Sequence, residues 1–566
     1  MGASESRNSL PDMRALFATL FILSTSIQAA APQVDWLFPI GAQRGSEALA
    51  QIGGKYNWPL KVWSEADGIK FVPEKKGFYR IKVGKDVTPG PYLVRFYDAN
   101  GSAPPRVFFV SKAVDVPEKE PNNEMLKPQK VASLPAVIQG KFGTGGDVDS
   151  YQFSLKKGQT LVAQMDAYTA GVSMDALMLL RDTRGVKLAF NHDAHSLDPR
   201  LIWKCSSDGD YVLQMACFKF PANSTSSFGG AAGLTYRVTV TNGPWVRHAW
   251  PASVREGVSS KIKLVGWNLK NDEVPVNDPG GDVLVLSTEA VNGPLRIPVL
   301  NGVQKVEKEP NDNNETANLI SFPATVSGRI DNPGDVDRYA FEVKKGERYR
   351  FDMSSFENGF LLDGQLALED SSGKELSVND DSNKKRDPLL NWTAPADGRY
   401  CVRVRSLLGK GGLEYFYRLH FIKPEPGFTA TVAAPQFAVN AGATNEVKVT
   451  VNYLDGYKGK LTVAANSLPK GVSANPVVVE KKGVVALKFV VSKDASLFSG
   501  PLSLLIGPEG AGSERKEVVC ALTSSGVNNG VPQGFPEYVI PETRHLWLTI
   551  LPPKKAVKKD DKPVKK

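Results

Sequence analysis

Two short acidic blocks hold the residues of this sequence best suited to chemistry. The first contains Glu118, Glu120 and Asn122 at every second position, and the second contains Asp147 and Asp149. Residues two apart in an extended chain point to the same side, so each block presents its oxygen atoms on one face. Calcium takes about six to eight such oxygens in proteins. Neither block contains His or Cys, which favours calcium over zinc or copper.

Both blocks occur twice. Glu118-Lys-Glu-Pro-Asn-Asn123 returns as Glu307-Lys-Glu-Pro-Asn-Asp312, and Gly146-Asp-Val-Asp-Ser-Tyr151 returns as Gly334-Asp-Val-Asp-Arg-Tyr339. Matches continue downstream in the same order and at nearly constant spacing, which indicates a duplicated domain. The further matched pairs are Phe153 with Phe341, Asp175 with Asp363, Asn191 with Asn379, Asp198 with Asp387, and Tyr211 with Tyr400.

Each copy has the pattern of a β-sandwich. Residues 151–155 and 339–343 alternate apolar and polar side chains, and Lys-Gly turns follow at Gly158 and Gly346. Alternating runs separated by turn residues are typical of antiparallel sandwiches. The whole chain is rich in glycine (51) and proline (39) and has no long helical periodicity. We therefore predict an all-β protein of tandem sandwich modules, jelly-roll-like and immunoglobulin-like.

The two copies resemble a known family. The Glu-x-Glu-Pro-Asn-Asn/Asp block followed by Gly-Asp-x-Asp-x-Tyr is similar to the bacterial pre-peptidase C-terminal (PPC) domain, over 114–243 and 303–424. That family is a jelly-roll-like sandwich, similar to the collagen-binding domains of clostridial collagenases. The resemblance implies an accessory module of the kind appended to secreted proteases and other exoproteins.

The resemblance also implies a ligand set, because the collagen-binding relatives hold calcium with linker Glu and Asn residues and two Asp residues at a strand entry. The first copy has Asn123 where the second has Asp312, which predicts weaker binding at the first site. The alternative is that these residues cap turns and tie down the strand entry without a metal. The expected ligands are Glu118, Glu120, Asn122, Asn123, Asp147 and Asp149, and Glu307, Glu309, Asn311, Asp312, Asp335 and Asp337.

Three further modules flank the copies. Residues 32–113 and 425–551 each contain short alternating runs and are expected to be immunoglobulin-like sandwiches. Residues 244–302 open with Trp250-Pro-Ala-Ser-Val-Arg-Glu-Gly257, which resembles the start of IPT/TIG-type domains, and are expected to form a β spacer domain.

The N-terminal segment suggests export. Arg14 precedes an apolar run over 15–23, and small residues follow to Ala31, so residues 1–31 are predicted to be a signal peptide. We expect a secreted, periplasmic or cell-surface protein with no transmembrane segment. The 552–566 tail is Lys-rich and predicted to be disordered, with contact to an anionic surface as the alternative. No nucleic-acid-binding motif occurs.

Two minor features leave alternatives open. Cys205 and Cys217 flank a predicted hairpin turning at Asp208-Gly209, and either a disulfide or buried thiols could result, with thiols favoured. The sequence contains no CxxC spacing, so a zinc site is not expected. In the loop from Asn191 to Asp198, His192 and His195 could form a transition-metal pair, but the second copy lacks both, so a solvated turn that includes Asp198 is favoured.

No catalytic constellation can be assembled. The sequence has no Gly-x-Ser-x-Gly elbow, no His-Glu-x-x-His and no phosphate loop, so we predict a protein that is not an enzyme. The leading hypothesis is a secreted binding or adhesion protein that uses tandem weak modules on an extracellular protein or polysaccharide. The alternatives are a structural component of the cell envelope or surface layer that self-associates, and an accessory or inhibitory subunit of a separate exoprotease.

Overall fold

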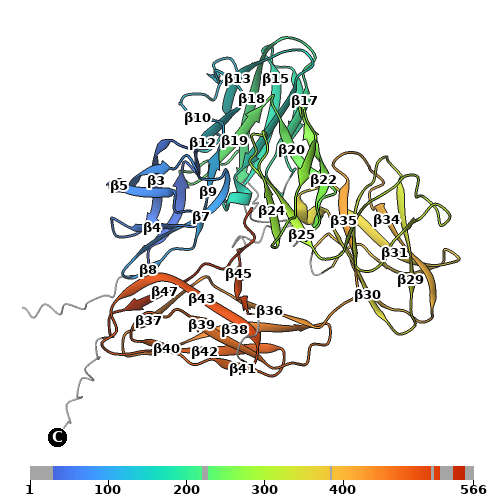
Figure 1. Ribbon diagram of the computed structural model, residues 1–566. Helices are drawn as coiled ribbons and strands as arrows, with labels where there is room; N and C mark the ends of the chain where they lie inside the picture. The colour runs from blue at the N-terminus through green and yellow to red at the C-terminus, as the bar shows by residue number, and fades with distance from the viewer. Residues whose placement is uncertain are drawn as a thin grey trace, which may run out of the picture. The chain divides into compact units, whose positions relative to one another are not determined.

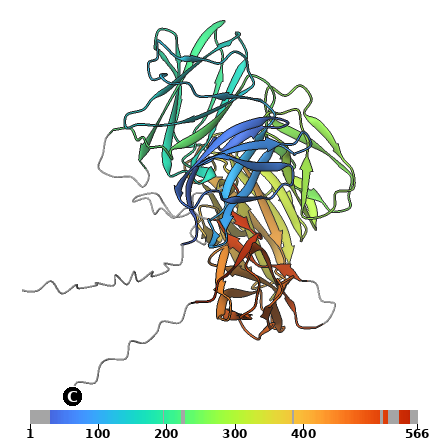
Figure 2. The ribbon, with the colours of Figure 1, turned by 90° about the vertical axis from the view of Figure 1, so that its left-hand side faces the viewer.

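The computed structural model describes residues 30–194, 196–219, 227–382, 385–510, 515–522 and 539–554. Strands dominate both views (Figure 1, Figure 2), and the helices within the described residues are two 3-10 turns, η1 (Tyr168–Ala170) and η2 (Phe356–Asn358). The predicted all-β class is confirmed. No helix in these ranges is long and apolar enough to cross a membrane. The predicted signal peptide, except its last two residues, and the tail from residue 555 lie outside the described residues.

The first duplicated module is a sandwich of two five-stranded sheets, drawn in blue-green to green at 114–241 (Figure 1). Its strands are β10 (Val114–Pro117), β11 (Gln129–Lys130), β12 (Ala136–Lys141), β13 (Asp149–Leu155), β14 (Thr160–Asp166), β15 (Met174–Asp182), β16 (Lys187–Asn191), β17 (Arg200–Lys204), β18 (Gly209–Lys219) and β19 (Thr235–Thr241). The sheet orders are β10-β12-β19-β14-β17 and β11-β13-β18-β15-β16. The alternation on β15 shows why the layers form, because Met174, Ala176, Met178 and Leu180 all point inward.

The second duplicated module repeats this plan strand for strand. Its strands are β26 (Val303–Val306), β27 (Asn318–Leu319), β28 (Ala324–Arg329), β29 (Val336–Val343), β30 (Arg348–Ser354), β31 (Gly364–Asp370), β32 (Glu375–Asn379), β33 (Leu389–Thr393), β34 (Gly398–Ser406) and β35 (Phe416–Ile422). The sheet orders are β26-β28-β35-β30-β33 and β27-β29-β34-β31-β32. The duplication inferred from the repeated blocks is therefore present in the fold.

The linker before each sandwich is divided between its two sheets. In the first module β10 pairs in parallel with β12, at the edge of one sheet, and β11 pairs in parallel with β13, at the edge of the other. The second module has the same two parallel pairs. The sequence predicted antiparallel sandwiches, and the parallel pairing of these linker strands was not predicted. The acidic stretch between the two linker strands must cross from one sheet to the other, which brings it to one edge of the sandwich.

The predicted hairpin around Asp208-Gly209 is wrong. Strand β17 pairs with β14, whereas β18 pairs with β13 and β15 in the opposite sheet, so the chain crosses between layers at this point. Cys205 and Cys217 therefore do not face each other on neighbouring strands. Both remain buried thiols, as do Cys401 and Cys520, which agrees with the favoured alternative.

The flanking modules are also two-sheet structures, each described by itself. The strands before β10 form sheets ordered β1-β3-β6-β5 and β2-β9-β7-β4, with β8 paired to β7. Their bounds are β1 (Gln33–Phe38), β2 (Gly41–Gln43), β3 (Glu47–Lys55), β4 (Lys61–Ser64), β5 (Ile69–Lys75), β6 (Phe78–Val83), β7 (Gly90–Asp98), β8 (Gly101–Ser102) and β9 (Arg106–Ser111).

The segment between the duplicated modules forms two three-stranded sheets, and the last module forms two larger ones. The small sheets contain β20 (Trp245–Trp250), β22 (Ser260–Trp267) and β23 (Glu273–Val276), and β21 (Val254–Arg255), β25 (Leu295–Leu300) and β24 (Val283–Leu286). The last module contains β36 (Gly427–Val432), β37 (Gln436–Asn440), β38 (Thr444–Leu454), β39 (Leu461–Asn466), β40 (Val472–Ala474), β41 (Val477–Val479), β42 (Gly483–Val491), β43 (Phe498–Pro508), β44 (Lys516–Glu517), β45 (Val519–Ala521), β46 (Glu542–Thr543) and β47 (Leu546–Leu551).

Candidate metal centres

The first acidic cluster joins the linker to the entry of β13. One carboxylate oxygen from each of Glu118, Glu120 and Asp149 lies within 4.8 Å of the others. Glu118 follows directly after β10, and its Oε2 accepts the Lys141 amide at 3.2 Å, which ties the linker to β12. Asp149 begins β13 and is fully buried. The tertiary structure therefore brings together acids that the sequence places in two separate blocks.

The remaining residues predicted for the first site surround this cluster. Asn122 is buried, and with its amide nitrogen turned inward it donates to Glu120 Oε2 at 3.3 Å and to Asp149 Oδ1 at 3.1 Å. Asp147 is engaged in the neighbouring turn instead. Its Oδ2 accepts a hydrogen bond from the backbone amide of Gly143 at 2.6 Å, and its Oδ1 accepts one from the side-chain amide of Asn123 at 3.0 Å. Asp147 and Asn123 thus hold the neighbouring turn while the other four form the cluster.

The second cluster has the same geometry. Carboxylate oxygens of Glu307, Glu309 and Asp337 lie within 4.8 Å of one another. Asn311 is completely buried beside them, yet neither its Oδ1 nor its Nδ2 has a hydrogen-bond partner. Asp337 is also completely buried, and its Oδ1 lacks a partner. Buried polar atoms without partners are rare in folded proteins, and two of these three, Asn311 Oδ1 and Asp337 Oδ1, are oxygens of the kind that bind a hard cation.

The two sites differ in acidity around the cluster. Asp335 Oδ2 accepts a hydrogen bond from the backbone amide of Asp331 at 2.6 Å, just as Asp147 Oδ2 accepts one from the backbone amide of Gly143 in the first copy. The second copy therefore adds an acid at Asp331, where the first has glycine, and another at Asp312, where the first has Asn123. Both added carboxylates raise the pKa of Glu309 through their charge, after the larger effect of its burial. Asp331 also pairs with Arg329 and was missed from the sequence.

In both clusters, the closeness of several carboxylates is energetically unfavourable when no cation is bound. Burial, and then the charge of Glu118, raises the pKa of Asp149 to about 9. Burial, and then the charge of Glu309, raises the pKa of Glu307 to about 8. Burial, and then the charge of Glu307, raises the pKa of Asp337 well above its ordinary value. A bound cation would offset this repulsion and compensate the lost hydration. The donor set is oxygen throughout, which suits a hard cation such as calcium.

A pair of buried tyrosines lies against each cluster. Tyr151 and Tyr339 end the repeated blocks of the sequence, whereas their partners Tyr236 and Tyr417 were missed from it. Tyr236 donates to Asp149 Oδ2 at 2.6 Å, and its hydroxyl lies 2.9 Å from that of Tyr151. In the second module Tyr417 donates to Asp337 Oδ2, and its hydroxyl lies 2.6 Å from that of Tyr339. The available signal was a Gly and a Tyr retained in both copies outside the acidic blocks, at Gly140 with Tyr236 and at Gly328 with Tyr417.

The histidine loop of the first copy is an ion-pair network. His192 Nε2 lies 2.9 Å from Asp175 Oδ1, and its Nδ1 lies 3.3 Å from Asp193 Oδ2. The neighbouring carboxylates of Asp175 and then Asp193 raise the pKa of His192 to about 10, so the ring is a cation at neutral pH. His195 lies outside the described residues.

Asp198 corrects the solvated-turn prediction. It is buried, and its carboxylate accepts the backbone amides of Ala167, Tyr168 and Thr169 at the start of η1. Asp387 does the same for Ser355, Phe356 and Glu357 at η2. Both residues are interior caps, because a carboxylate satisfies amides that no strand can pair.

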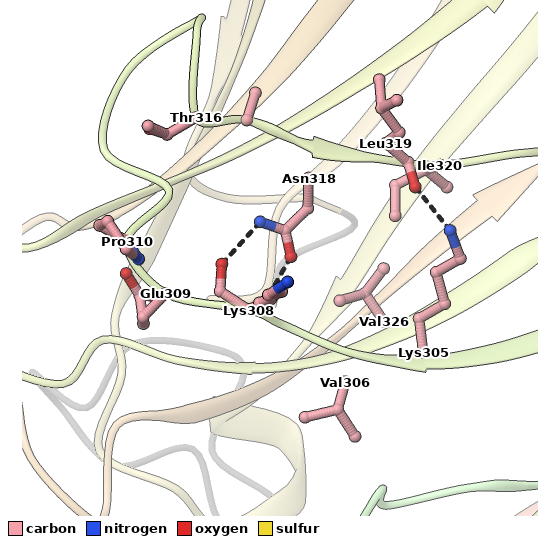
Figure 3. A pocket seen from close by; sticks show the side chains of 11 residues that line it. Lys305, Val306, Lys308, Glu309, Pro310, Thr316, Asn318, Leu319, Ile320 and Val326 are labelled. Carbon is pink, nitrogen blue, oxygen red and sulfur yellow. Dashed lines mark hydrogen bonds between the residues drawn. The ribbon is translucent and has the colours of Figure 1, made fainter.

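A cavity of about 480 Å³ lies beside the second cluster, between β26 and β27 (Figure 3). Glu309 borders it, and the Asn318 side chain links the two edges by accepting the Lys308 amide at 2.7 Å and donating to the Lys308 carbonyl at 2.8 Å. Gln129 makes the same kind of clamp in the first copy, accepting from Lys119 and donating to Pro117. The linker is thus held closed next to each acidic cluster.

The fold and the paired clusters define a multidomain β-sandwich protein with a duplicated acidic module. Its second copy contains a bacterial pre-peptidase C-terminal domain, because residues 335–406 match the model of that family. This confirms the family resemblance for the second copy, and the first copy shares its strand order.

Known proteins are similar to this chain over part of its length or at low sequence identity. A probable subtilase-type serine protease of Deinococcus radiodurans is 31% identical over 175 residues, which is 27% of this chain and only 24% of that protease. The pre-peptidase C-terminal domain of collagenase from Bacillus anthracis is 17% identical, over 20% of this chain and 99% of that domain, with a TM-score of 0.17. A tetra-tandem repeat of a large adhesion protein is 9% identical, over 85% of this chain and 98% of the repeat, with a TM-score of 0.11.

Proposed function

We propose that this chain is an exported, non-catalytic binding protein whose two duplicated modules are each stabilised by calcium. The observation that carries the calcium assignment is the second cluster, where Asn311 and Asp337 Oδ1 are buried without partners among crowded carboxylates. The PPC domain supports the accessory, extracellular character of the chain. Of the twelve residues predicted from the sequence, those that would hold the two ions are Glu118, Glu120, Asn122 and Asp149 in the first module and Glu307, Glu309, Asn311 and Asp337 in the second, with Asp331 as an added charge at the second site.

Calcium would act as a clamp between linker and sandwich. Glu118 and Asn122 belong to the stretch between β10 and β11, whereas Asp149 belongs to β13. An ion bound to all three ties the linker to the sandwich and removes the repulsion that opposes this arrangement. The expected consequence is a fixed direction in which the chain enters each module, which suits a protein that presents several weak sites at once.

Thermal unfolding of the full chain with calcium and with a chelator tests the metal assignment, together with elemental analysis of the purified protein. Calcium should raise the unfolding midpoint, and Asp337→Asn should lose most of the rise contributed by the second module. Glu342→Gln, on the exposed face of β29, is the matched control and should keep the full rise. An unchanged midpoint and no bound metal in the wild-type chain would exclude calcium.

The binding role is tested by co-sedimentation of the full chain with insoluble fibrillar protein and with insoluble polysaccharide. We expect retention on one of these polymers in calcium and weaker retention in chelator, because the linkers lose their fixed path. A chain that remains in the supernatant with every polymer, in both buffers, contradicts the adhesion proposal.

Exposed edge strands favour self-association as a second candidate. Within the described residues, β16 pairs only with β15 and exposes Phe190 by 53%, and β32 pairs only with β31 and exposes Val378 by 47%. Open edges with apolar side chains are templates for pairing with another chain. Light scattering should then detect oligomers that Phe190→Lys with Val378→Lys disrupts, whereas a strictly monomeric wild-type chain rules out this candidate.

The partial similarity to a subtilase-type protease favours a third candidate, an accessory subunit of a separate exoprotease. Co-purification of protease activity with the tagged chain from the producing cells would support it. A preparation free of protease activity, from cells that secrete active protease, would contradict this candidate.

A further inference from the structure

We infer that Tyr236 and Tyr417 are the positioning residues of the two metal centres, each holding one oxygen of a buried aspartate so that the other faces the cation. This rests on the calcium sites proposed above. In the first module Tyr236 donates to Asp149 Oδ2 at 2.6 Å. In the second, Tyr417 donates to Asp337 Oδ2, and the opposite oxygen, Oδ1, has no partner.

The direction of the hydroxyl proton follows from the other contacts. A phenol has one proton, and Tyr236 is closer to Asp149 Oδ2 than to Glu118 Oε1, at 2.6 Å against 3.2 Å. Tyr151 lies 2.9 Å from Tyr236 and 3.3 Å from Glu118 Oε1, so it can donate to either. The pair therefore supplies two protons to two ligand carboxylates from the core side, opposite the linker.

The second module repeats this arrangement with different spacing along the chain. Tyr339 lies 2.6 Å from the Tyr417 hydroxyl and 3.3 Å from Glu307 Oε2. All four tyrosines are completely buried. A buried hydroxyl is costly unless it is hydrogen-bonded, and phenylalanine would fill a sandwich core at lower cost. The hydroxyls are therefore best explained by the hydrogen bonds that they donate to the carboxylates.

A glycine opposite each donor tyrosine makes room for the hydroxyl. Gly140 pairs with Tyr236 between β12 and β19, and Gly328 pairs with Tyr417 between β28 and β35. A Cβ at Gly140 would lie 2.3 Å from the Tyr236 hydroxyl oxygen, and one at Gly328 would lie 2.5 Å from that of Tyr417. Any larger residue would push the phenol away from its aspartate, so the glycines belong to the same device.

Calcium titration calorimetry of the full chain tests this inference, with the two sites resolved by single variants. Tyr236→Phe should weaken the first site by about tenfold or more and leave the second unchanged, and Tyr417→Phe should do the reverse, since partners of metal ligands typically contribute 10–100-fold to affinity. The untouched site in each variant is an internal control. Tyr92→Phe, whose hydroxyl is bonded outside both duplicated modules, should change neither.

The glycine variants separate positioning from a general structural role. Gly140→Ala keeps the hydroxyl but displaces it, so it should weaken the first site as Tyr236→Phe does, while Gly209→Ala, with open space around its Cβ, should not. Positioning predicts that the calcium-dependent rise in unfolding midpoint falls more than the midpoint in chelator. Wild-type affinity at both sites in Tyr236→Phe and Tyr417→Phe overturns the inference but leaves the calcium proposal standing. No calcium binding by the wild-type chain overturns both.

Discussion

Carboxylate oxygens of Glu118 and Asp149 lie within 4.8 Å of each other, although one residue follows the linker strand β10 and the other begins the core strand β13. Two acids from different parts of the chain are rarely buried together without compensation. Their contact connects the linker to the sandwich, and its strength therefore depends on what neutralises the pair.

Asp149→Asn is expected to have opposite effects with and without calcium. In chelator the variant should be more stable than wild type by about 1 kcal/mol or more, because it removes a buried carboxyl group whose strongly raised pKa costs free energy on folding at neutral pH, and one pKa unit corresponds to about 1.4 kcal/mol. In calcium it should be less stable, because a ligand is lost. Calorimetric unfolding in both buffers measures this crossover, and a variant less stable than wild type in both would contradict the crowding argument.

The second site is expected to bind calcium more tightly than the first. Asp312 and Asp331 add negative charge where the first copy has Asn123 and Gly143. Each added carboxylate should be worth roughly tenfold in affinity, or about 1.4 kcal/mol. Asn123→Asp should therefore tighten the first site and Asp312→Asn should weaken the second, as measured by calcium titration. Equal affinities in the wild-type chain would show that the added acids do not face the ion.

Asp198 should be important for stability although it is far from either centre. Its carboxylate accepts three backbone amides and the Thr169 hydroxyl, the last at 2.5 Å. Asp198→Ala leaves these buried donors unpaired and should lower the free energy of unfolding by about 2–4 kcal/mol. Denaturant unfolding measures the loss, and Asp210→Ala, on the exposed side of β18, serves as the control. A loss no larger than that of the control would argue against the capping role.

The His192 ion pair should give the first module a pH-dependent contribution to stability. The pKa of His192 rises from 6.5 to about 10 in the folded chain, so the folded state holds the proton more tightly. The stabilisation is therefore complete below about pH 6.5 and is lost as pH rises towards 10. The side chain is 37% exposed, so solvent screening limits the effect to less than about 1 kcal/mol.

His192→Asn removes the group that titrates in that network. The difference in free energy of unfolding between wild type and His192→Asn should shrink between pH 6.5 and pH 10 in denaturant titrations. The same difference at every pH would mean that the ring contributes by packing alone.

The strands and the duplication could be predicted from the sequence because both depend on patterns among residues close together in the chain. Alternation over 151–155 indicates a strand with one buried face, and the repeated blocks at Glu118 and Glu307 reveal the duplication directly. The spacing and oxygen donors of the acidic blocks favour calcium, and this assignment stays a prediction. Partner strands could not be assigned in this way, which is why the hairpin expected at Asp208-Gly209 is instead a crossing between sheets.

The sequence by itself determined the repeated modules, the strand character of their segments and the identity of the oxygen-bearing residues. Only the tertiary structure decided which of them meet. Tyr236 reaches Asp149, and Tyr417 reaches Asp337, from strands near the far end of each module, with Gly140 and Gly328 opposite the rings. Such contacts leave no periodic signal along the chain, because they depend on sheet order and register. The same reason places Asp198 in the interior, where the sequence suggested a turn in water.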